Sequence, residues 1–114
     1  MSVRYLEIVS KDANSLIDLY SDLHDLTFGS PNPDLGEARV ASQADGTLVG
    51  IREPLAAHEQ PIVRGYLAVR DFRSAVKLAE RRGAVVAYPP TQQGQSGTFA
   101  IVIHGGVQHG LWQP

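Results

Sequence analysis

The chain has 114 residues, of which 43% are hydrophobic and 19% are charged, and its formal net charge is −2. This size and balance are typical of one globular domain with its own core, and they argue against a disordered chain. The sequence has no cysteine, no signal-peptide core and no apolar run long enough to cross a membrane, so thiolate chemistry is excluded and we expect a cytoplasmic protein.

The charge is divided unevenly along the chain. Residues 1–54 carry nine acidic and four basic side chains (−5), whereas residues 61–114 carry two acidic and six basic ones (+4). No basic run with interleaved aromatic residues occurs, which argues against a nucleic-acid interface. The asymmetry either makes the halves, or two subunits, attract one another or reflects chance placement of solvated charges.

The first predicted elements are a strand and a helix. A run of β-branched and aromatic residues predicts a strand over 3–9, and Asp12 is a suitable N-cap for the helix that follows. Apolar residues at helical spacing predict one buried stripe on that helix, formed by Ala13, Leu16, Ile17, Tyr20 and Leu23.

A hairpin is expected after that helix. Residues 26–28 could form a short strand, and a loop rich in proline and glycine follows them. Asp45-Gly46 then predicts a tight turn between strands over 37–43 and 48–52.

The second half of the chain repeats this order. A strand is predicted over 62–69, and a helix is predicted after Asp71, with Arg81-Arg82 and Gly83 as its C-terminal signal. The apolar stripe of this helix is formed by Phe72, Ala75, Val76 and Ala79. Three strands are expected to follow, over 84–88, 98–103 and 107–112, the first of them ended by Pro89-Pro90.

A short motif recurs in the two halves. Gly46, Gly50 and Pro54 are followed sixty positions later by Gly106, Gly110 and Pro114. The shared motif and the shared order of elements predict two βαβββ modules, residues 1–56 and 57–114, in one compact α+β domain. A ferredoxin-like fold would supply too few strands.

The pattern resembles the glyoxalase/bleomycin-resistance/extradiol-dioxygenase group, the vicinal oxygen chelate superfamily. The fragments that carry the likeness are Glu7-Ile8, Asp12, Leu19-Tyr20 and Leu26-x-Phe28 in the first half, and 66–71, Gly83-Ala84, Pro89-Pro90 and 110–113 in the second. The resemblance implies curved mixed sheets that enclose a cavity, with a helix on the other face of each sheet. Asp25 departs from the family pattern by standing where glycine is usual, which is tolerable because aspartate can adopt left-handed backbone angles.

The resemblance also implies four positions for the ligands of a metal ion. In this sequence they are Tyr5, Gly50, Arg64 and Gly110. None has the histidine, glutamate or glutamine that such a site needs, and glycine has no side chain to coordinate with. We therefore expect no metal site and no cofactor. His104 and His109 flank the last turn, and two histidines alone make a weak metal site.

Strand alternation divides the side chains into two faces. If Gly50 and Gly110 face the cavity, their strands direct Val49, Ile51 and Leu111 to the helix side. The residues then expected to line the cavity and bind a ligand are Tyr5, Glu7, Arg52, Arg64, Tyr66, Gln108 and Trp112.

Several of these residues have two interpretations. Trp112 could stack on a planar or cationic ligand or could fill a dry core. Glu7 is the one candidate for a general base, but an ion pair with Arg52 or Arg64 is the simpler interpretation and would leave it a poor base. The two arginines could instead bind an anionic substrate.

The preferred interpretation is a metal-free binding protein for a drug-like small molecule, planar or cationic, which acts as a homodimer. The alternative is a lyase, isomerase or dioxygenase that uses an unconventional metal site or Glu7 as general base. A degenerate module that serves only in protein interactions is a third hypothesis.

Overall fold

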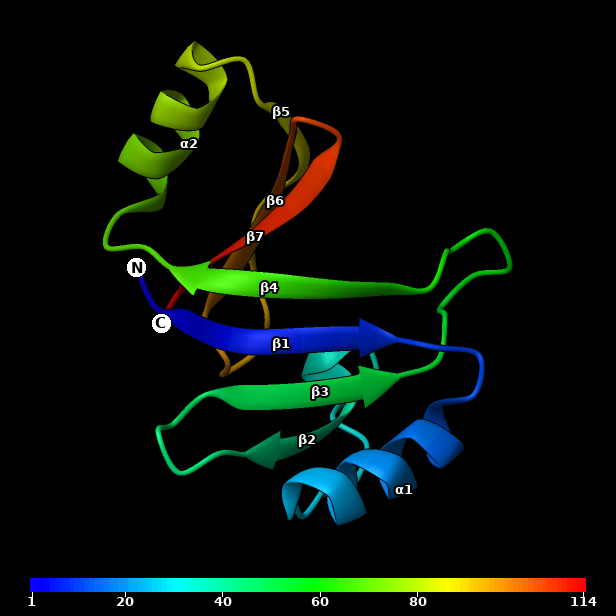
Figure 1. Cartoon of the computed structure of the whole chain (residues 1–114). Coiled ribbons are helices and arrows are strands. Elements are labelled where there is room, and N and C mark those ends of the chain that lie inside the picture. Colours follow the sequence, from blue (N-terminus) through cyan, green and yellow to red (C-terminus); the bar gives the residue numbers. More distant parts are fainter. The chain divides into compact units, whose positions relative to one another are not determined.

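The computed structural model describes residues 1–114 and contains seven β-strands, two α-helices and one short 3₁₀ helix (Figure 1). In chain order they are β1 (Val3–Val9), α1 (Ala13–His24), η1 (Pro33–Leu35), β2 (Arg39–Ser42), β3 (Leu48–Arg52), β4 (Ile62–Ala68), α2 (Phe72–Arg81), β5 (Val85–Gln92), β6 (Thr98–His104) and β7 (Val107–Gln113). Backbone contacts divide the chain into a first unit, Tyr5–Val63, and a second unit formed by Met1–Arg4 and Arg64–Pro114. Neither helix is long and apolar enough to span a membrane.

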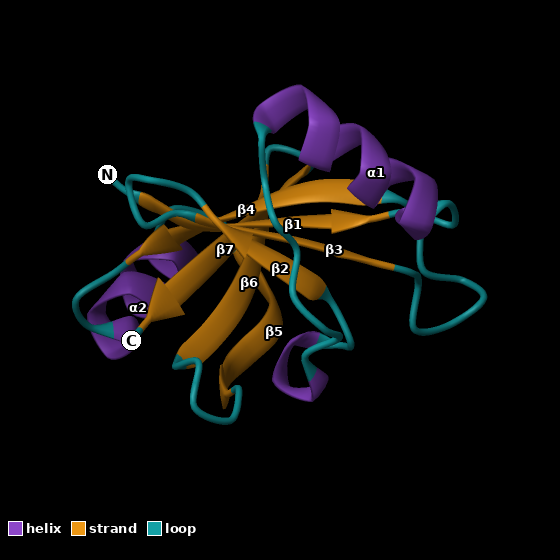
Figure 2. Ribbon diagram, turned by 90° about the horizontal axis from the view of Figure 1, so that it is seen from below, coloured by secondary structure: helices purple, strands orange, loops and turns teal.

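The first unit is a three-stranded sheet with α1 on one face (Figure 2). β3 lies between β1, to which it is parallel, and β2, to which it is antiparallel. The predicted turn at Asp45-Gly46 is present, with the Gln43 N–H donating to the Thr47 carbonyl at 2.9 Å. The core of the unit is the interface between α1 and the sheet, formed by Ile8, Ala13, Ile17, Phe28, Ala41, Val49 and Ile51.

The expected strand over 26–28 is absent, which corrects the first module from βαβββ to βαββ. Phe28 is buried, and the Gly29 N–H donates to the Val40 carbonyl at 2.9 Å, so the segment does approach β2. The Gly29 carbonyl, however, accepts from the Arg39 side chain at 2.8 Å. A ladder needs backbone partners for both groups, and only one is present here.

The buried stripe on α1 is shorter than predicted. Ala13 and Ile17 are buried and Tyr20 is half-buried, whereas Leu23 is 65% exposed. An α-helix advances about 100° per residue, so Leu23 lies about 80° from the direction of Ala13. This places it at the margin of the stripe.

The two helix starts differ in their capping. Asp71 caps α2 as predicted, because its carboxylate accepts from the Arg73 N–H at 3.1 Å. Asp12 precedes α1 as predicted, but its side chain makes no capping hydrogen bond. Its backbone angles (φ −117°, ψ 47°) differ from the extended ones of Asp71 (φ −144°, ψ 112°), which suit an N-cap.

The second unit is a four-stranded sheet in the order β4-β7-β6-β5, with α2 beside β5. β4 and β7 are parallel, and the other two pairs are antiparallel. The unit has the predicted βαβββ order, and Gly105 and Gly106 form the last turn with φ of 61° and 75°.

Pro89-Pro90 does not end β5, contrary to the sequence-based expectation. The strand continues to Gln92, and its register against β6 shifts between Val86 and Tyr88 and again between Tyr88 and Thr91. Proline is tolerated here because β5 is paired only with β6, and proline without an N–H fits an edge strand or a bulge.

Candidate functional site

The predicted cavity-facing residues of the first unit share the sheet face opposite α1. Glu7 on β1 is the register partner of Gly50 on β3, and Arg52 follows two residues later on the same face. Tyr5, Glu7 and Arg52 are all buried. The alternation that sends Val49 and Ile51 into the α1 core is confirmed.

Arg52 is the centre of a buried ionic network. Its Nε donates to Glu7 Oε2 at 3.0 Å, and its Nη1 and Nη2 donate to Glu59 Oε1 and Oε2 at 3.0 and 2.7 Å. Burial lowers the pKa of Arg52, but the hydrogen bonds and charges of Glu59 and Glu7 outweigh it and raise that pKa above its usual value. Arg52 thus remains charged and holds both carboxylates.

This network decides between the two interpretations of Glu7, a general base or a partner in an ion pair. The ion pair with Arg52 is formed, and it engages Glu7 Oε2. A general base must reach a substrate proton, whereas Glu7 is only 7% exposed and is held by the Arg52 guanidinium. Glu7 is therefore poorly placed to act as a base.

Glu59 is a site residue that sequence reasoning missed. It lies in the polar linker after β3, where no periodic pattern identifies a partner. The structure fixes it because Glu59 Oε1 also accepts from the Leu55 N–H at 2.7 Å, which folds the linker back onto Arg52. The only sequence signal is an acidic residue close to the end of a strand that carries a buried arginine.

The second unit brings its own predicted residues together. Arg64 on β4 is buried, and its Nε donates to Gln108 Oε1 on β7 at 2.9 Å. Its Nη1 donates to the Tyr66 hydroxyl at 3.5 Å. The polar end of this face therefore consists of a guanidinium, an amide and a phenol.

Three aromatic rings form the apolar end of the same face. The Tyr66 and Phe99 ring centroids are 5.1 Å apart, and those of Phe99 and Trp112 are 4.3 Å apart. Each ring is 5% exposed. Phe99 was not predicted as a site residue, although alternation along β6 places it beside Trp112, its register partner.

The two glycines at the expected metal positions lie beneath tyrosine side chains. A Cβ on Gly50 would overlap the Tyr5 hydroxyl, and a Cβ on Gly110 would lie 2.5 Å from Cδ2 of Tyr66. The space that a ligating side chain would need at each position is thus filled within the same unit. These residues do not fit a metal ion.

The histidines offer no alternative metal centre. His109 Nε2 lies 3.3 Å from the backbone oxygen of His104, so the pair meets through a ring and a carbonyl rather than through two imidazoles. No group of three histidine, aspartate or glutamate side chains gathers anywhere in the chain.

Comparison with known proteins identifies the fold. No protein-family model and no curated protein matches the sequence. Among solved structures, a hypothetical protein from Bacillus halodurans has a TM-score of 0.75 at 13% identity, over 99% of this chain and 94% of that one. Methylmalonyl-CoA epimerase from Mycobacterium tuberculosis has a TM-score of 0.74 at 17% identity, over 98% and 87%. The fold is glyoxalase-like.

A third similar structure is a complex with a ligand. It is the Q60A variant of the Streptomyces coelicolor methylmalonyl-CoA epimerase in complex with 2-nitronate-propionyl-CoA, with a TM-score of 0.67 at 17% identity, over 97% and 95% of the two chains. Epimerases of this kind belong to the vicinal oxygen chelate superfamily, so the α+β glyoxalase-like fold predicted from the sequence is confirmed. At these identities the likeness establishes the fold.

Proposed function

We propose that the chain is a metal-free protein that binds a small planar or cationic molecule. The observation that carries the metal-free part is the covering of Gly50 by Tyr5 and of Gly110 by Tyr66. Bulky aromatic side chains occupy the places where a metal-binding relative needs coordinating atoms. A face without ligating side chains in either half still has shape and polarity, which serve binding rather than metal chemistry.

The second-unit face supplies the groups for such binding. Trp112 and Phe99 supply flat apolar rings, and Arg64 with Gln108 supplies hydrogen-bond donors that fix orientation. Tyr5, Glu7 and Arg52 are proposed as further ligand contacts. The ionic network around Arg52 gives that group a fixed position before any ligand arrives.

Fluorescence of Trp112, the only tryptophan, reports binding on this face directly. Proflavine and acridine-9-carboxylate share one planar ring system but carry opposite charges, so they separate stacking from charge recognition. We expect saturable quenching by at least one of them and at least fivefold weaker binding, followed by ligand fluorescence, in Trp112→Leu. Lys77→Ala on the exposed side of α2 is the control. Unchanged binding in Trp112→Leu would contradict the proposed face.

Metal analysis tests the other half of the proposal. Protein purified without chelators is expected to contain no stoichiometric divalent metal, and added Mn²⁺, Co²⁺, Ni²⁺ or Zn²⁺ is expected to leave its melting temperature unchanged. One bound metal per chain, lost when His104 or Glu7 is replaced, would favour the enzymatic alternative.

The alternative is a lyase, isomerase or dioxygenase, and the similar epimerase structures suggest its first substrate. Methylmalonyl-CoA can be tested for exchange of its α-proton with deuterium in water, with Glu7→Gln as the paired variant. Because Arg52 holds Glu7 in an ion pair, we expect no exchange of the α-proton above the uncatalysed rate.

We also propose that the protein acts as a homodimer. The supporting observations are its small size, its glyoxalase-like fold and the opposite charge of its two halves. Native mass spectrometry is expected to show a dimer, and if the charges drive association, 0.5 M NaCl should weaken it. A monomer at all concentrations would contradict this.

A further inference from the structure

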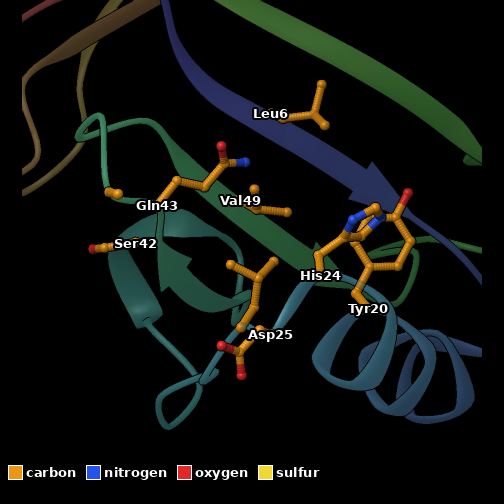
Figure 3. Close-up of a pocket in the computed structure, with 9 residues that line it drawn as sticks. Leu6, Tyr20, His24, Asp25, Ser42, Gln43 and Val49 are labelled. Carbon is orange, nitrogen blue, oxygen red and sulfur yellow. The ribbon is translucent and has the colours of Figure 1, made fainter.

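A cavity lies in the first unit, on the sheet face that carries α1. Its volume is about 540 Å³, within the range of small-molecule sites. Figure 3 shows the Tyr20 and His24 rings on one side and Gln43 on the other, with Val49 between them. Leu6 and Val49 belong to the face opposite Glu7, so this cavity is separate from the residues proposed above for ligand binding.

The lining combines an apolar floor with an aromatic wall. Leu6 and Leu26 are partly buried against the core and Val49 is buried in it, so the floor is fixed by the packing of the unit. Tyr20 and His24 meet edge to face at 5.2 Å. Gln43 lies at the rim beyond the end of β2 and is exposed.

Asp25 is the residue that fold stability does not explain. It ends α1 with left-handed backbone angles (φ 54°, ψ 50°), where glycine is the most favourable residue. The capping bond at this position runs from its backbone N–H to the Ser21 carbonyl, which any residue would supply. Its carboxylate forms no hydrogen bond or ion pair within the chain, although Asp25 borders the cavity.

The surrounding charge selects the sign of a ligand. Asp25 is the one acidic residue in the lining of this cavity, and no lysine or arginine lines it. A carboxylate at the border of a cavity attracts cations. The Tyr20 ring in the wall adds a surface on which a cation is favoured.

We propose that this cavity binds a small amphipathic organic cation, an amine with an apolar body. The body lies over Leu6, Leu26 and Val49, and the ammonium group lies near the Tyr20 ring and Asp25. This left-handed aspartate is then retained for its charge. The proposal does not depend on the function proposed above, because its residues all lie on the other face of the first unit.

Phenethylammonium and 3-phenylpropionate are suitable probes because both join a phenyl ring to a charged group by a short chain, and the charges are opposite. We expect titration of the ¹⁵N-labelled full chain with phenethylammonium to give saturable amide shifts over residues 20–26 and at Gln43. We expect 3-phenylpropionate to bind at least tenfold more weakly. Equal binding of the two probes would overturn the proposal.

Variants separate the groups in the site. Asp25→Asn keeps the side-chain shape and tolerates left-handed angles, so its fold is preserved while its affinity for phenethylammonium is expected to fall at least fivefold. Tyr20→Phe keeps the ring and should bind as the parent does, whereas Tyr20→Leu should bind more weakly.

Two outcomes show whether phenethylammonium binds in this cavity or on the second-unit face formed by Arg64, Gln108 and Trp112. Trp112→Leu is expected to leave phenethylammonium binding unchanged, even if it abolishes proflavine binding. Amide shifts centred on Trp112 and Gln108 instead of residues 20–26 would overturn the second site, as would full affinity in Asp25→Asn.

Discussion

Tyr5 lies directly over Gly50, so that a Cβ on the glycine would overlap the tyrosine hydroxyl. Tyr66 covers Gly110 in the same way, but there the carbonyl oxygen of Gly65 is also close, at 2.8 Å from a Cβ. At Gly50 the nearest atoms all belong to the Tyr5 side chain. Both glycines leave room for a tyrosine ring. At Gly50 only that ring limits the space, whereas at Gly110 the backbone of Gly65 limits it as well.

This difference predicts opposite outcomes in two double variants. Gly50→Ala and Gly110→Ala should each lower the free energy of unfolding by about 1–3 kcal/mol, as overpacking does. Adding Tyr5→Leu should recover part of the loss at Gly50, because only that side chain must give way. Adding Tyr66→Leu should not recover the loss at Gly110, because the backbone obstacle remains. Urea denaturation of the four variants measures both recoveries, and equal recovery at the two positions would contradict the packing described.

The Arg52 network predicts a large stability effect away from any ligand. Arg52→Met removes the guanidinium that holds Glu7 and Glu59, and breaking a buried ion pair costs roughly 3–5 kcal/mol. Adding Glu7→Gln should restore part of the loss because it removes the isolated charge. Glu53→Gln, an exposed neighbour, is the control. A change below about 0.5 kcal/mol in Arg52→Met, the size of an ordinary surface substitution, would contradict a structural role for the network.

Alternation along the strands was enough to predict which side chains share a face. Glu7 and Arg52 are brought together as expected, and so are Arg64 and Gln108, because the period of two is set by local backbone geometry. Glu59 could not be predicted, since it reaches Arg52 through the fold of a linker without periodicity. The alternation of residues along a strand therefore predicts which side chains share a sheet face. The conformation of a linker cannot be predicted in this way because it depends on tertiary contacts.

The misjudged strand ends have a similar cause. Pro89-Pro90 ends a strand by local rules, but β5 continues because it is paired only with β6 and bulges at the prolines. The helix-side cavity was also beyond sequence reasoning. It depends on how the end of α1 meets the end of β2, which brings His24 and Gln43 to one opening.

The capping of α2 predicts an acid-sensitive contribution to stability. The Ser74 hydroxyl donates to Asp71 Oδ2 at 2.8 Å and, together with the backbone N–H of Arg73, lowers the pKa of Asp71 from its ordinary 3.8, while burial has a smaller opposing effect. A lowered folded-state pKa gives stability that is present above pH 3.8 and is lost as pH falls through the lower folded value.

Asp12 provides the matched comparison, because it precedes α1 without a capping bond. We expect Asp71→Ala to lower the melting temperature at pH 7, to lose most of that effect near pH 2, and to exceed Asp12→Ala in size. Thermal unfolding of both variants at the two pH values tests this. Equal losses from Asp12→Ala and Asp71→Ala would show that the observed capping bond contributes nothing.

Asp25 predicts a substitution that stabilises the fold. Its φ of 54° is unfavourable for residues with a Cβ, less so for aspartate and asparagine than for others. Asp25→Gly should therefore raise the free energy of unfolding by about 0.5–1 kcal/mol, Asp25→Asn should change it little, and Asp25→Ala should lower it. Urea denaturation of the three variants gives the order. If Asp25→Gly were destabilising instead, the carboxylate would have a structural role, which would contradict its retention for binding a cation.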